Sequence, residues 1–365
     1  MSFNLKDLLE DVIDRNASDL HISVGYPPVI RIDGKLIQLK EMGILTEVDI
    51  EHALQAVLTP AQLEKYKTTN ELEFSIAFSG IAGVEARFRG NAYFSLGSKS
   101  AALRLIPPII RSIDELNLPP VLKDVCKQHR GLFLVTGPTG HGKSTTMAAM
   151  LNEINNTRDD HIITIEDPVE FVHKPVKCLI NQREVGTDTK NFAEGLLRAL
   201  RQDPDVLLIG ELRDLETIST AITAAETGHL VLATLHTQDA VQSFDRLADV
   251  FPPSQQEQIK VQLAAVLIGI SSQLLIPLGD GRGGGRICAT ELLISNPAVK
   301  NCIREGKSSQ LKTLIQTGLS AGMHTMEQCL ATLVRNNILS PDTALNYAYD
   351  PKELRRVLRA RGNPY

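Results

Sequence analysis

A glycine-rich segment in the middle of the chain has the residue types and spacing that bind phosphate groups. Residues 137–144 read Gly-Pro-Thr-Gly-His-Gly-Lys-Ser and fit the pattern G-x-x-x-x-G-K-[ST], between an apolar run and a run compatible with a helix. Glycines let successive backbone N–H groups converge on phosphate oxygens, and the N-terminus of a following helix adds partial positive charge. The pattern therefore predicts a nucleotide site made by Gly137, Pro138, Thr139, Gly140, His141, Gly142, Lys143, Ser144 and Thr145.

The side chains at and beyond this segment indicate ATP and Mg²⁺ as the bound pair. Lys143 can reach the β- and γ-phosphates, and the Ser144 hydroxyl can ligate Mg²⁺. Glu166 and Glu211 each follow a short apolar run. Ligands bind at the carboxyl ends of parallel strands, so either carboxylate can hold Mg²⁺ or orient an attacking water. The alternative is a solvated or helix-capping carboxylate, which the presence of the phosphate loop disfavours.

Two histidines and three arginines stay ambiguous from the residues alone. His229 and His236 lie on either side of an apolar run, and their spacing does not distinguish a packed histidine from one that contacts phosphate. Arg87, Arg89 and Arg104 fall on strands expected near the N-terminus. Surface arginines are usually just solvated, whereas in a ring of subunits an arginine can neutralise γ-phosphate charge in a neighbour's site.

The pattern of apolar residues predicts the sheet that positions these side chains. Four short runs are continuously apolar and are each followed by polar or glycine-rich residues: Gly131–Thr136, Ile162–Ile165, Val206–Ile209 and Leu230–Thr234. Strands buried on both faces of a parallel sheet require such runs, and helix-compatible stretches separate them. We therefore expect an α/β domain over residues 121–365, with a helical C-terminal tail.

A smaller α+β domain is expected over residues 1–106. Helical spacing begins at Leu5, and Thr46 with Asp49 forms a capping box for a second helix. Strands are expected at 19–24, 29–39, 71–78, 84–94 and 101–106, with Asp33-Gly34 as a hairpin turn. Pro107-Pro108 and Pro119-Pro120 bracket a linker over residues 107–120.

Composition excludes several classes of protein. The net charge is −5 without a Lys/Arg block, so no nucleic-acid partner is expected, and 43% hydrophobic residues exclude a disordered chain. The five cysteines form no C-x-x-C pair, which favours a reduced, cytosolic protein. Residues 261–279 carry no formal charge, but Gln273 and Pro277 among them favour a buried helix running into a strand over a membrane span.

Seven blocks of residues, taken in order, resemble one family. They are Ala17–Ser23, Gly137–Ser144, Thr164–Phe171, Asn181–Val185, Leu200–Asp205, Gly210–Asp214 and Ala225–Thr237. Together they resemble the PilT-type retraction ATPases of type IV pili, within the secretion ATPase superfamily. The resemblance covers residues 3–350, and the block from Asn181 to Thr237 is far more specific than the phosphate loop.

The resemblance implies a PAS-like N-terminal domain, a RecA-like P-loop ATPase domain and a homohexamer that drives pilus retraction and twitching motility. It places the ring in the cytoplasm, peripherally at the inner membrane, with a membrane platform protein and a second retraction or extension ATPase as partners. By the same resemblance Glu166 is the catalytic base and Glu211 the Walker B glutamate, a metal ligand with Ser144. His229 lies near the γ-phosphate, and Arg89 and Arg104 are arginine fingers.

The sequence departs from the family at two places and leaves rivals open. His141 stands where the family usually has serine, and Lys300 and Cys302 replace residues of a C-terminal motif tied to retraction. The second departure keeps an auxiliary PilU-like motor as an alternative. An assembly or extension ATPase is less favoured because the tetracysteine insertion typical of those relatives is missing. A RecA-like DNA motor or a non-hydrolysing nucleotide-binding scaffold is the alternative of a different class.

Overall fold

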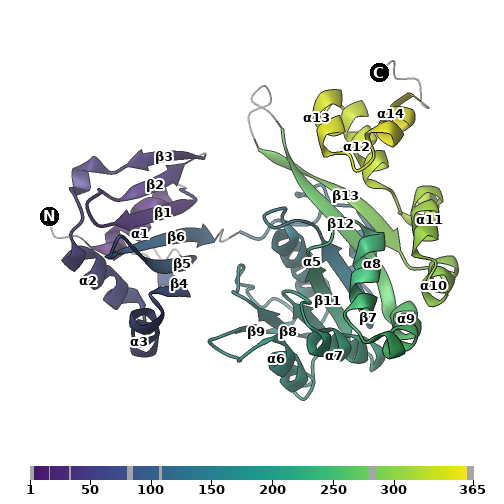
Figure 1. Ribbon diagram of the computed structural model, residues 1–365, viewed down its shortest axis with the longest axis horizontal. Helices are drawn as coiled ribbons and strands as arrows, with labels where there is room; N and C mark the ends of the chain where they lie inside the picture. Colours follow the sequence, from purple (N-terminus) through teal and green to yellow (C-terminus); the bar gives the residue numbers. More distant parts are fainter. Residues whose placement is uncertain are drawn as a thin grey trace. The chain divides into compact units, whose positions relative to one another are not determined.

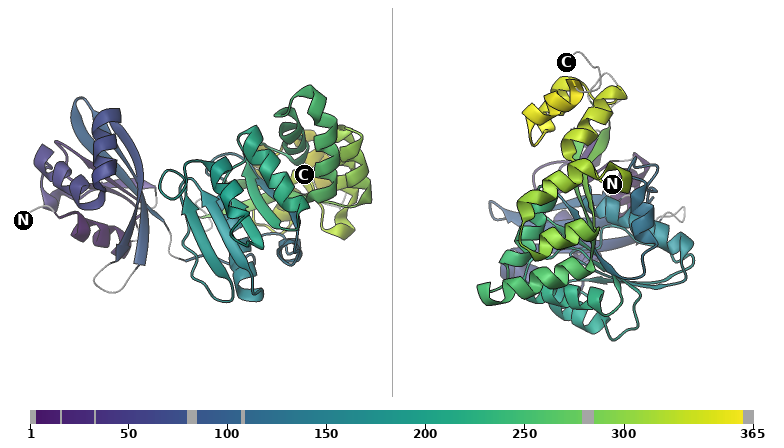
Figure 2. Two further views of the ribbon diagram at one scale, coloured as in Figure 1. Left: turned by 90° about the horizontal axis from the view of Figure 1, so that it is seen from below. Right: turned by 90° about the vertical axis from the view of Figure 1, so that its right-hand side faces the viewer.

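The computed structural model describes residues 4–15, 17–32, 34–79, 85–106, 109–278 and 285–359. Over this range the chain is a mixed α/β protein, and each of its two compact units has its own sheet and its own hydrophobic core (Figures 1 and 2). Along the chain the two units meet between Ile109 and Ile110, and the short segment Glu170–Val172 is grouped with the first unit. Pro107 and Pro108 of the expected linker lie outside the described residues, so the domain boundaries stay a prediction.

The first unit is built on a six-stranded antiparallel sheet in the order β3-β2-β1-β6-β5-β4. Alternation along the strands separates its faces, because Leu20 and Ile22 of β1 point into the core while His21 between them points the other way. The strands are β1 (Asp19–Ser23), β2 (Val29–Ile32), β3 (Lys35–Gln38), β4 (Glu71–Ser79), β5 (Glu85–Ser95) and β6 (Ser98–Ile106).

Three helices contribute to the core on the apolar face: α1 (Leu5–Asp14), α2 (Glu47–Val57) and α3 (Pro60–Thr69). The expected helical spacing from Leu5 is confirmed, and so is the capping box of Thr46 with Asp49. Helix α3 was not predicted, although Thr59 and Gln62 form a second capping box there. Strands β2 and β3 pair as an antiparallel hairpin, but Asp33 of the predicted turn lies outside the described residues.

The second unit contains a seven-stranded sheet in the order β13-β12-β7-β11-β10-β8-β9, and all its pairs are parallel except β12 with β13. The four apolar runs predicted as buried parallel strands are its adjacent central strands, which confirms that expectation. The strands are β7 (Gly131–Thr136), β8 (His161–Glu166), β9 (Leu179–Glu184), β10 (Val206–Ile209), β11 (Leu230–Leu235), β12 (Leu267–Pro277) and β13 (Arg286–Ile294).

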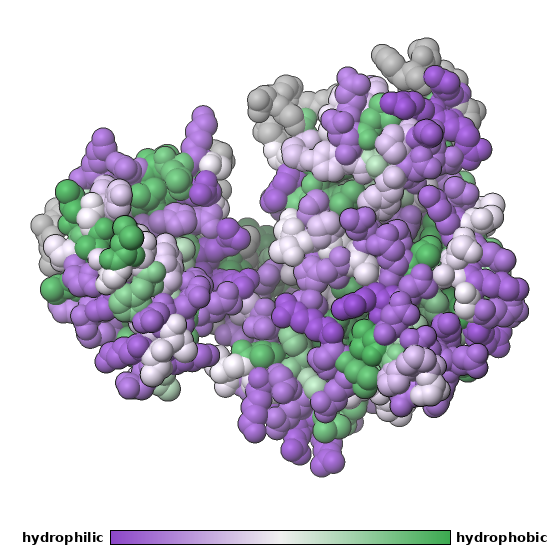
Figure 3. All heavy atoms as spheres, in the orientation of Figure 1, coloured by the Kyte–Doolittle hydropathy of each residue, from purple (hydrophilic) through white to green (hydrophobic). Residues whose placement is uncertain are grey.

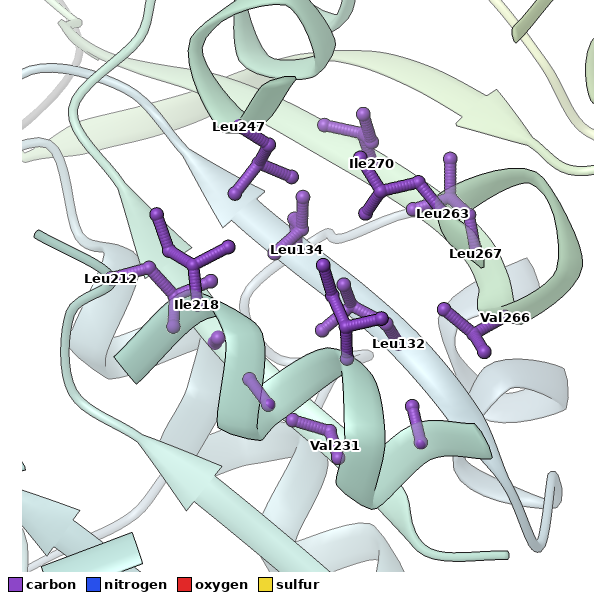
Figure 4. Close-up of a cluster of buried hydrophobic side chains, with 14 of the residues drawn as sticks. Leu132, Leu134, Leu212, Ile218, Val231, Leu247, Leu263, Val266, Leu267 and Ile270 are labelled. Carbon is purple, nitrogen blue, oxygen red and sulfur yellow. The ribbon is translucent and has the colours of Figure 1, made fainter. Parts of the chain in front are cut away.

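Helices cover both faces of this sheet, which explains why its central strands are apolar throughout. Leu132 and Leu134 of β7 belong to a core with α6 (Phe192–Ala199), α7 (Leu215–Glu226), α8 (Ala240–Asp249) and α9 (Pro253–Val266). Figure 4 shows both leucines among labelled residues of α7, α8 and α9. Phe133 and Val135 pack on the opposite face against α4 (Val121–Cys126) and α5 (Lys143–Thr157).

Over residues 261–277 the uncharged segment is the end of α9 running directly into β12, as the sequence indicated. Among the described residues no helix has both the length and the apolar character needed to cross a bilayer. The glycine-rich piece 279–285 was expected to connect two strands; β12 and β13 lie on either side of it, and residues 279–284 are outside the described part.

The expected helical tail consists of α10 (Pro297–Arg304), α11 (Leu311–Thr317), α12 (Met326–Arg335), α13 (Pro341–Tyr347) and α14 (Pro351–Arg359). The last three form a separate core against Leu274 and Ile276 of β12 and Ile287 and Ala289 of β13. The surface of this tail and of the rest of the second unit is mainly hydrophilic in the view of Figure 3, with small scattered apolar patches.

Candidate nucleotide-binding site

Apart from His229, the predicted site residues of the second unit gather at one edge of its sheet. Because β7, β8, β10 and β11 are parallel, their carboxyl ends lie side by side. The phosphate loop follows β7, and Glu166 is the last residue of β8. Glu211 comes two residues after β10, and His236 comes directly after β11.

The loop from Gly137 to Gly142 turns sharply between β7 and α5. Gly137, Gly140 and Gly142 all have positive φ, and Gly142 is the N-cap of α5. At Gly137 a side chain is also excluded by space, because a Cβ would lie 2.4 Å from the carbonyl oxygen of Gln273 in β12. The loop therefore presses against β12, and its following helix points its N-terminus at the space where phosphate would bind.

Lys143 is buried, and its side chain turns back into the loop. Its Nζ donates to the carbonyl oxygens of Gly137 at 2.8 Å and Pro138 at 3.1 Å. The positive charge of Lys143 is thus held within the loop by main-chain oxygens. This arrangement suits the binding of a phosphate chain.

His236 joins the loop to Glu211. Its Nδ1 lies 3.3 Å from Thr139 Oγ1 and 3.4 Å from Lys143 Nζ, and its Nε2 lies 3.2 Å from Glu211 Oε2. Since the lysine ammonium can only donate, Nδ1 is the acceptor, and the ring proton sits on Nε2 facing the carboxylate. The His236 imidazole therefore connects the phosphate loop, the segment that carries Glu211 and the end of β11.

Glu211 also contacts Arg213, whose Nη2 lies 2.6 Å from Oε2. Burial by itself would raise the pKa of Glu211, but the hydrogen bonds from Arg213 and His236 and the charge of Arg213 outweigh it, so the pKa lies below its usual value. The carboxylate is therefore ionised at neutral pH, as a metal ligand must be.

Glu166 is oriented from two neighbouring strands. Its Oε1 accepts hydrogen bonds from Thr164 Oγ1 at 2.7 Å and from Gln182 Nε2 at 3.1 Å. The backbone N–H of Gly210 donates to the Ile165 carbonyl at 2.8 Å, which brings the segment that carries Glu211 alongside the end of β8. Glu166 and Glu211 thus lie on adjacent segments of the same edge.

His229 requires a correction. It precedes β11, so it lies at the amino end of that strand, while the loop, the two glutamates and His236 follow strand carboxyl ends. Its Nδ1 contacts the Ala224 carbonyl at 2.9 Å. His236 lies seven residues further along the chain, across the whole of β11, which is about 23 Å at roughly 3.3 Å per residue. Within one chain the structure does not bring His229 to the phosphate loop.

Arg89 and Arg104 belong to the first unit, where they are cross-strand neighbours on β5 and β6. Arg104 Nε lies 2.8 Å from Asp19 Oδ1, and Arg89 Nη2 lies 3.3 Å from Glu73 Oε2. Arg87, also on β5, donates to Ser75 Oγ at 2.9 Å. Their role toward a nucleotide stays a prediction.

The donor atoms near the loop fit Mg²⁺. Ser144 is the second residue of α5 and offers a hydroxyl, and Glu211 offers an ionised carboxylate. No cluster of three or more His, Cys, Asp or Glu residues suited to a metal occurs in the part of the chain that the structure describes. One hydroxyl and one carboxylate leave most positions of an octahedral ion to phosphate and water oxygens, which is how Mg²⁺ is usually bound.

Sequence reasoning missed four residues that hold the site together. Arg213 and Gln182 stand inside the blocks that carry the family resemblance but received no role, and Thr164 precedes Glu166 on the same face of β8. Gln273, which contacts the loop from β12, was considered only as a polar residue that disfavours a membrane span. No local signal in the sequence places β12 next to the loop.

Comparison with known proteins agrees with this geometry. Residues 2–333 match the family described as Type II/IV secretion system protein. The chain is 44% identical to the type IV pilus retraction ATPase PilT of Pseudomonas aeruginosa over 349 residues, 96% of this chain and 99% of that one. It is 36% identical to the type IV pilus ATPase PilU of the same organism over 352 residues, 96% and 90% of the two chains. A crystal structure of the pilus retraction motor PilT with bound ADP superposes with a TM-score of 0.89 at 44% identity, over 97% of this chain and 99% of that one.

Proposed function

Because the chain belongs to the family of type II/IV secretion system proteins, we propose that it is an ATP-hydrolysing motor that retracts type IV pili and supports twitching motility. The observation that carries this proposal is the 44% identity to a pilus retraction ATPase over almost the full length of both chains. The likeness therefore includes the first unit and the helical tail as well as the nucleotide-binding unit. The convergence of the loop, Glu166, Glu211 and His236 at one sheet edge supports hydrolysis.

In this proposal the first unit is a PAS-like domain and the second a RecA-like ATPase domain. An antiparallel sheet with helices on one face supports the first assignment. A parallel sheet with helices on both faces and a phosphate loop after β7 supports the second. The motor works as a homohexamer in the cytoplasm, at the inner-membrane face, with a membrane platform protein and a second pilus ATPase as partners. Nucleic acid is not a partner.

The proposed chemistry is positioning and charge neutralisation. The loop N–H groups and Lys143 bind the phosphates of ATP, and Ser144 and Glu211 hold the metal. Bound Mg²⁺ supplies positive charge on the phosphate oxygens. Glu166, fixed by its two hydrogen-bond donors, orients the attacking water and accepts its proton. His236 contacts both Glu211 and the loop, so it would hold the metal ligand at a fixed position relative to the phosphates.

Arg89 and Arg104 act in this proposal on the nucleotide of a neighbouring subunit. The Arg104 side chain is 72% exposed and only its Nε faces Asp19 in the contact described, so the outer edge of the guanidinium is available for a phosphate oxygen. A second arginine directly across the strand pair doubles the positive charge at this point of the sheet. Closure of the first unit over a bound nucleotide would then couple hydrolysis to motion.

The test is pilus display in a strain that lacks this protein, scored by electron microscopy beside the complemented strain. Retraction predicts many surface pili and loss of twitching, and complementation with Lys143→Ala should not restore retraction. Cells without pili would identify an extension ATPase instead. A purified protein that turns over no ATP, or whose turnover survives Lys143→Ala, would reject the motor altogether and leave a nucleotide-binding scaffold.

The second candidate is an auxiliary retraction motor of the PilU type. It is favoured by the 36% identity to PilU and by Lys300 and Cys302 in the altered C-terminal motif. Cys302 is buried in the core under α10, and Lys300 Nζ donates to the Ala265 carbonyl at 3.4 Å, so both replacements are structural parts of the helical tail. An auxiliary motor predicts normal pilus numbers in the deletion strain.

A further inference from the structure

Strand β12 continues past the end of its neighbour β7, and the phosphate loop occupies the place where β7 would continue. The last pair of the two strands is Ser272 with Thr136, but β12 runs on to Pro277. On this side the backbone of β12 beyond Ser272 has no strand partner in the described sheet, so its polar groups need other partners. Gly137 lies against it so closely that a Cβ would meet the Gln273 carbonyl oxygen.

His141 supplies one of these partners with its side chain. Its Nδ1 accepts a hydrogen bond from the backbone N–H of Leu275 at 3.0 Å. Its own carbonyl oxygen accepts from Gln273 Nε2 at 2.7 Å. The Gln273 amide is 1% exposed, and its Oε1 accepts from Thr146 Oγ1 at 2.9 Å in the first turn of α5. Three hydrogen bonds thus connect β12 with both the loop and the helix that follows it.

We propose that His141 is a positioning residue that, together with Gln273, fastens the phosphate loop to β12 and so sets the affinity of the loop for nucleotide. The inference rests on the proposed function, in which this loop binds ATP. The ring is bonded to the strand behind the loop, so any contact of His141 with nucleotide would come from its backbone N–H, as expected of the other loop residues. The serine usual at this position in the family is too short to make this contact.

The contact requires a neutral ring. Nδ1 accepts from Leu275, so the ring proton is on Nε2, and a second proton on Nδ1 would abolish the bond. Burial, with Lys143 of α5 and Arg286 of β13 as the charged neighbours, lowers the pKa of His141. Gln273 and Leu275, its partners on β12, carry no charge. The loop is therefore fastened at neutral pH and released in acid.

One net hydrogen bond of this kind contributes about 1 kcal/mol, or about a fivefold change in an equilibrium constant. His141→Ala should therefore speed amide exchange at Leu275 and weaken binding of a fluorescent ADP analogue by about fivefold. His141→Ser, which introduces the residue usual in the family, should have the same effect. It provides a second test in case the alanine variant misfolds. The Asn side chain places Oδ1 where the ring has Nδ1, so His141→Asn should recover most of both properties.

The measurements are hydrogen exchange of the segment around Leu275 and binding of the ADP analogue, each at pH 7.5 and pH 5.5. The ratio of wild-type to His141→Asn affinity should fall in acid, because asparagine cannot be protonated; phosphate protonation affects both proteins and cancels. His52→Ala, which removes an exposed histidine from α2, is the matched control and should behave as wild type.

Exchange at Leu275 that is unchanged in both His141→Ala and His141→Ser would overturn the fastening. Faster exchange with unchanged ADP affinity would overturn the positioning role. Failure of His141→Asn to restore affinity would show that the ring acts through something other than its acceptor, which also contradicts the proposal. A wild-type protein that binds no ADP would reject the proposed function, and the exchange data would then still decide whether His141 holds the loop to β12.

Discussion

The Glu166 carboxylate is held in place by the protein before any substrate is bound. Thr164 donates to Oε1 from the same strand and Gln182 donates from β9, the neighbouring strand on one side. Two donors on one oxygen fix the plane of the carboxylate. The residue that the proposed reaction needs as a base is therefore pre-oriented, a condition that general-base catalysis depends on.

Glu166→Gln should bind ATP almost as tightly as wild type but lose at least about a hundredfold in turnover. Glutamine keeps the shape and the Oε1 acceptor, whereas it cannot take a proton from water, and general-base contributions are on the order of 10²–10⁴. Phosphate release and nucleotide binding, measured on the same preparation, check this prediction. Glu216→Gln, an exposed carboxylate on α7, is the control. Turnover near the wild-type rate would mean that Glu166 is not the base.

At the scale of elements, the sequence predicted what burial on both faces dictates. The four central strands carry runs such as Val206–Ile209, in which every residue is buried. Because such a run has no polar face, it is easily recognised as a strand of a parallel sheet. Strand β9 was missed because Leu179–Glu184 is an edge strand with alternating exposed positions and charged residues. His229 is a different case: its place before the apolar run already put it at the amino end of the strand, and only the family resemblance assigned it to the γ-phosphate.

Contacts between elements distant in sequence could not be predicted, and the contact made by Glu291 is an example. It lies on β13, and its Oε1 accepts from the backbone N–H of Ala240 at the start of α8. Asp239, Glu327 of α12 and Lys312 of α11 are its charged neighbours. Burial, more than the two acidic neighbours, raises the pKa of Glu291 to about 7. The carboxyl group thus ties the start of α8, which follows the His236 loop, to β13.

The stability of the second unit should fall as the pH rises from about 4.5 to about 7, and Glu291→Gln should remove part of that fall. In the unfolded chain this carboxyl titrates near 4.5, so between pH 4.5 and 7 the folded protein holds a proton that the unfolded chain has released. Above pH 7 the folded state bears a buried charge. Glutamine keeps the acceptor for Ala240 without that charge, and should gain up to about 3 kcal/mol over wild type at pH 8.

Urea unfolding of Glu291→Gln and wild type at pH 5 and pH 8 tests this sign. The variant should have the higher midpoint at pH 8, and the two proteins should converge at pH 5. Glu305→Gln, an exposed carboxylate after α10, should show no such pH-dependent gain. A larger gain for Glu291→Gln at pH 5 than at pH 8 would contradict the raised pKa.

At the scale of the whole molecule, the proposed hexamer explains the arginines of the first unit. Arg89 and Arg104 stand side by side on the polar face of its sheet and contact single acidic partners, Glu73 and Asp19. Surface ion pairs contribute about 0–1 kcal/mol, too little to account for this concentration of positive charge on stability grounds. In a ring of identical subunits, one subunit's arginines can serve the nucleotide site of the next.

Mixing two inactive variants tests whether the arginines act between subunits. Arg104→Ala should hydrolyse ATP poorly because it lacks charge neutralisation in the transition state, and Glu166→Gln because it lacks the base. In a mixed ring, a site in an Arg104→Ala subunit keeps Glu166 and can receive Arg104 from a Glu166→Gln neighbour. If the subunits exchange at random, on the order of a quarter of the sites are complete. The mixture should therefore regain activity that neither variant has alone. Denaturing and refolding the two together ensures exchange, and wild type treated in the same way gives the reference rate. A mixture no more active than its components would place the action of Arg104 within its own subunit or outside catalysis.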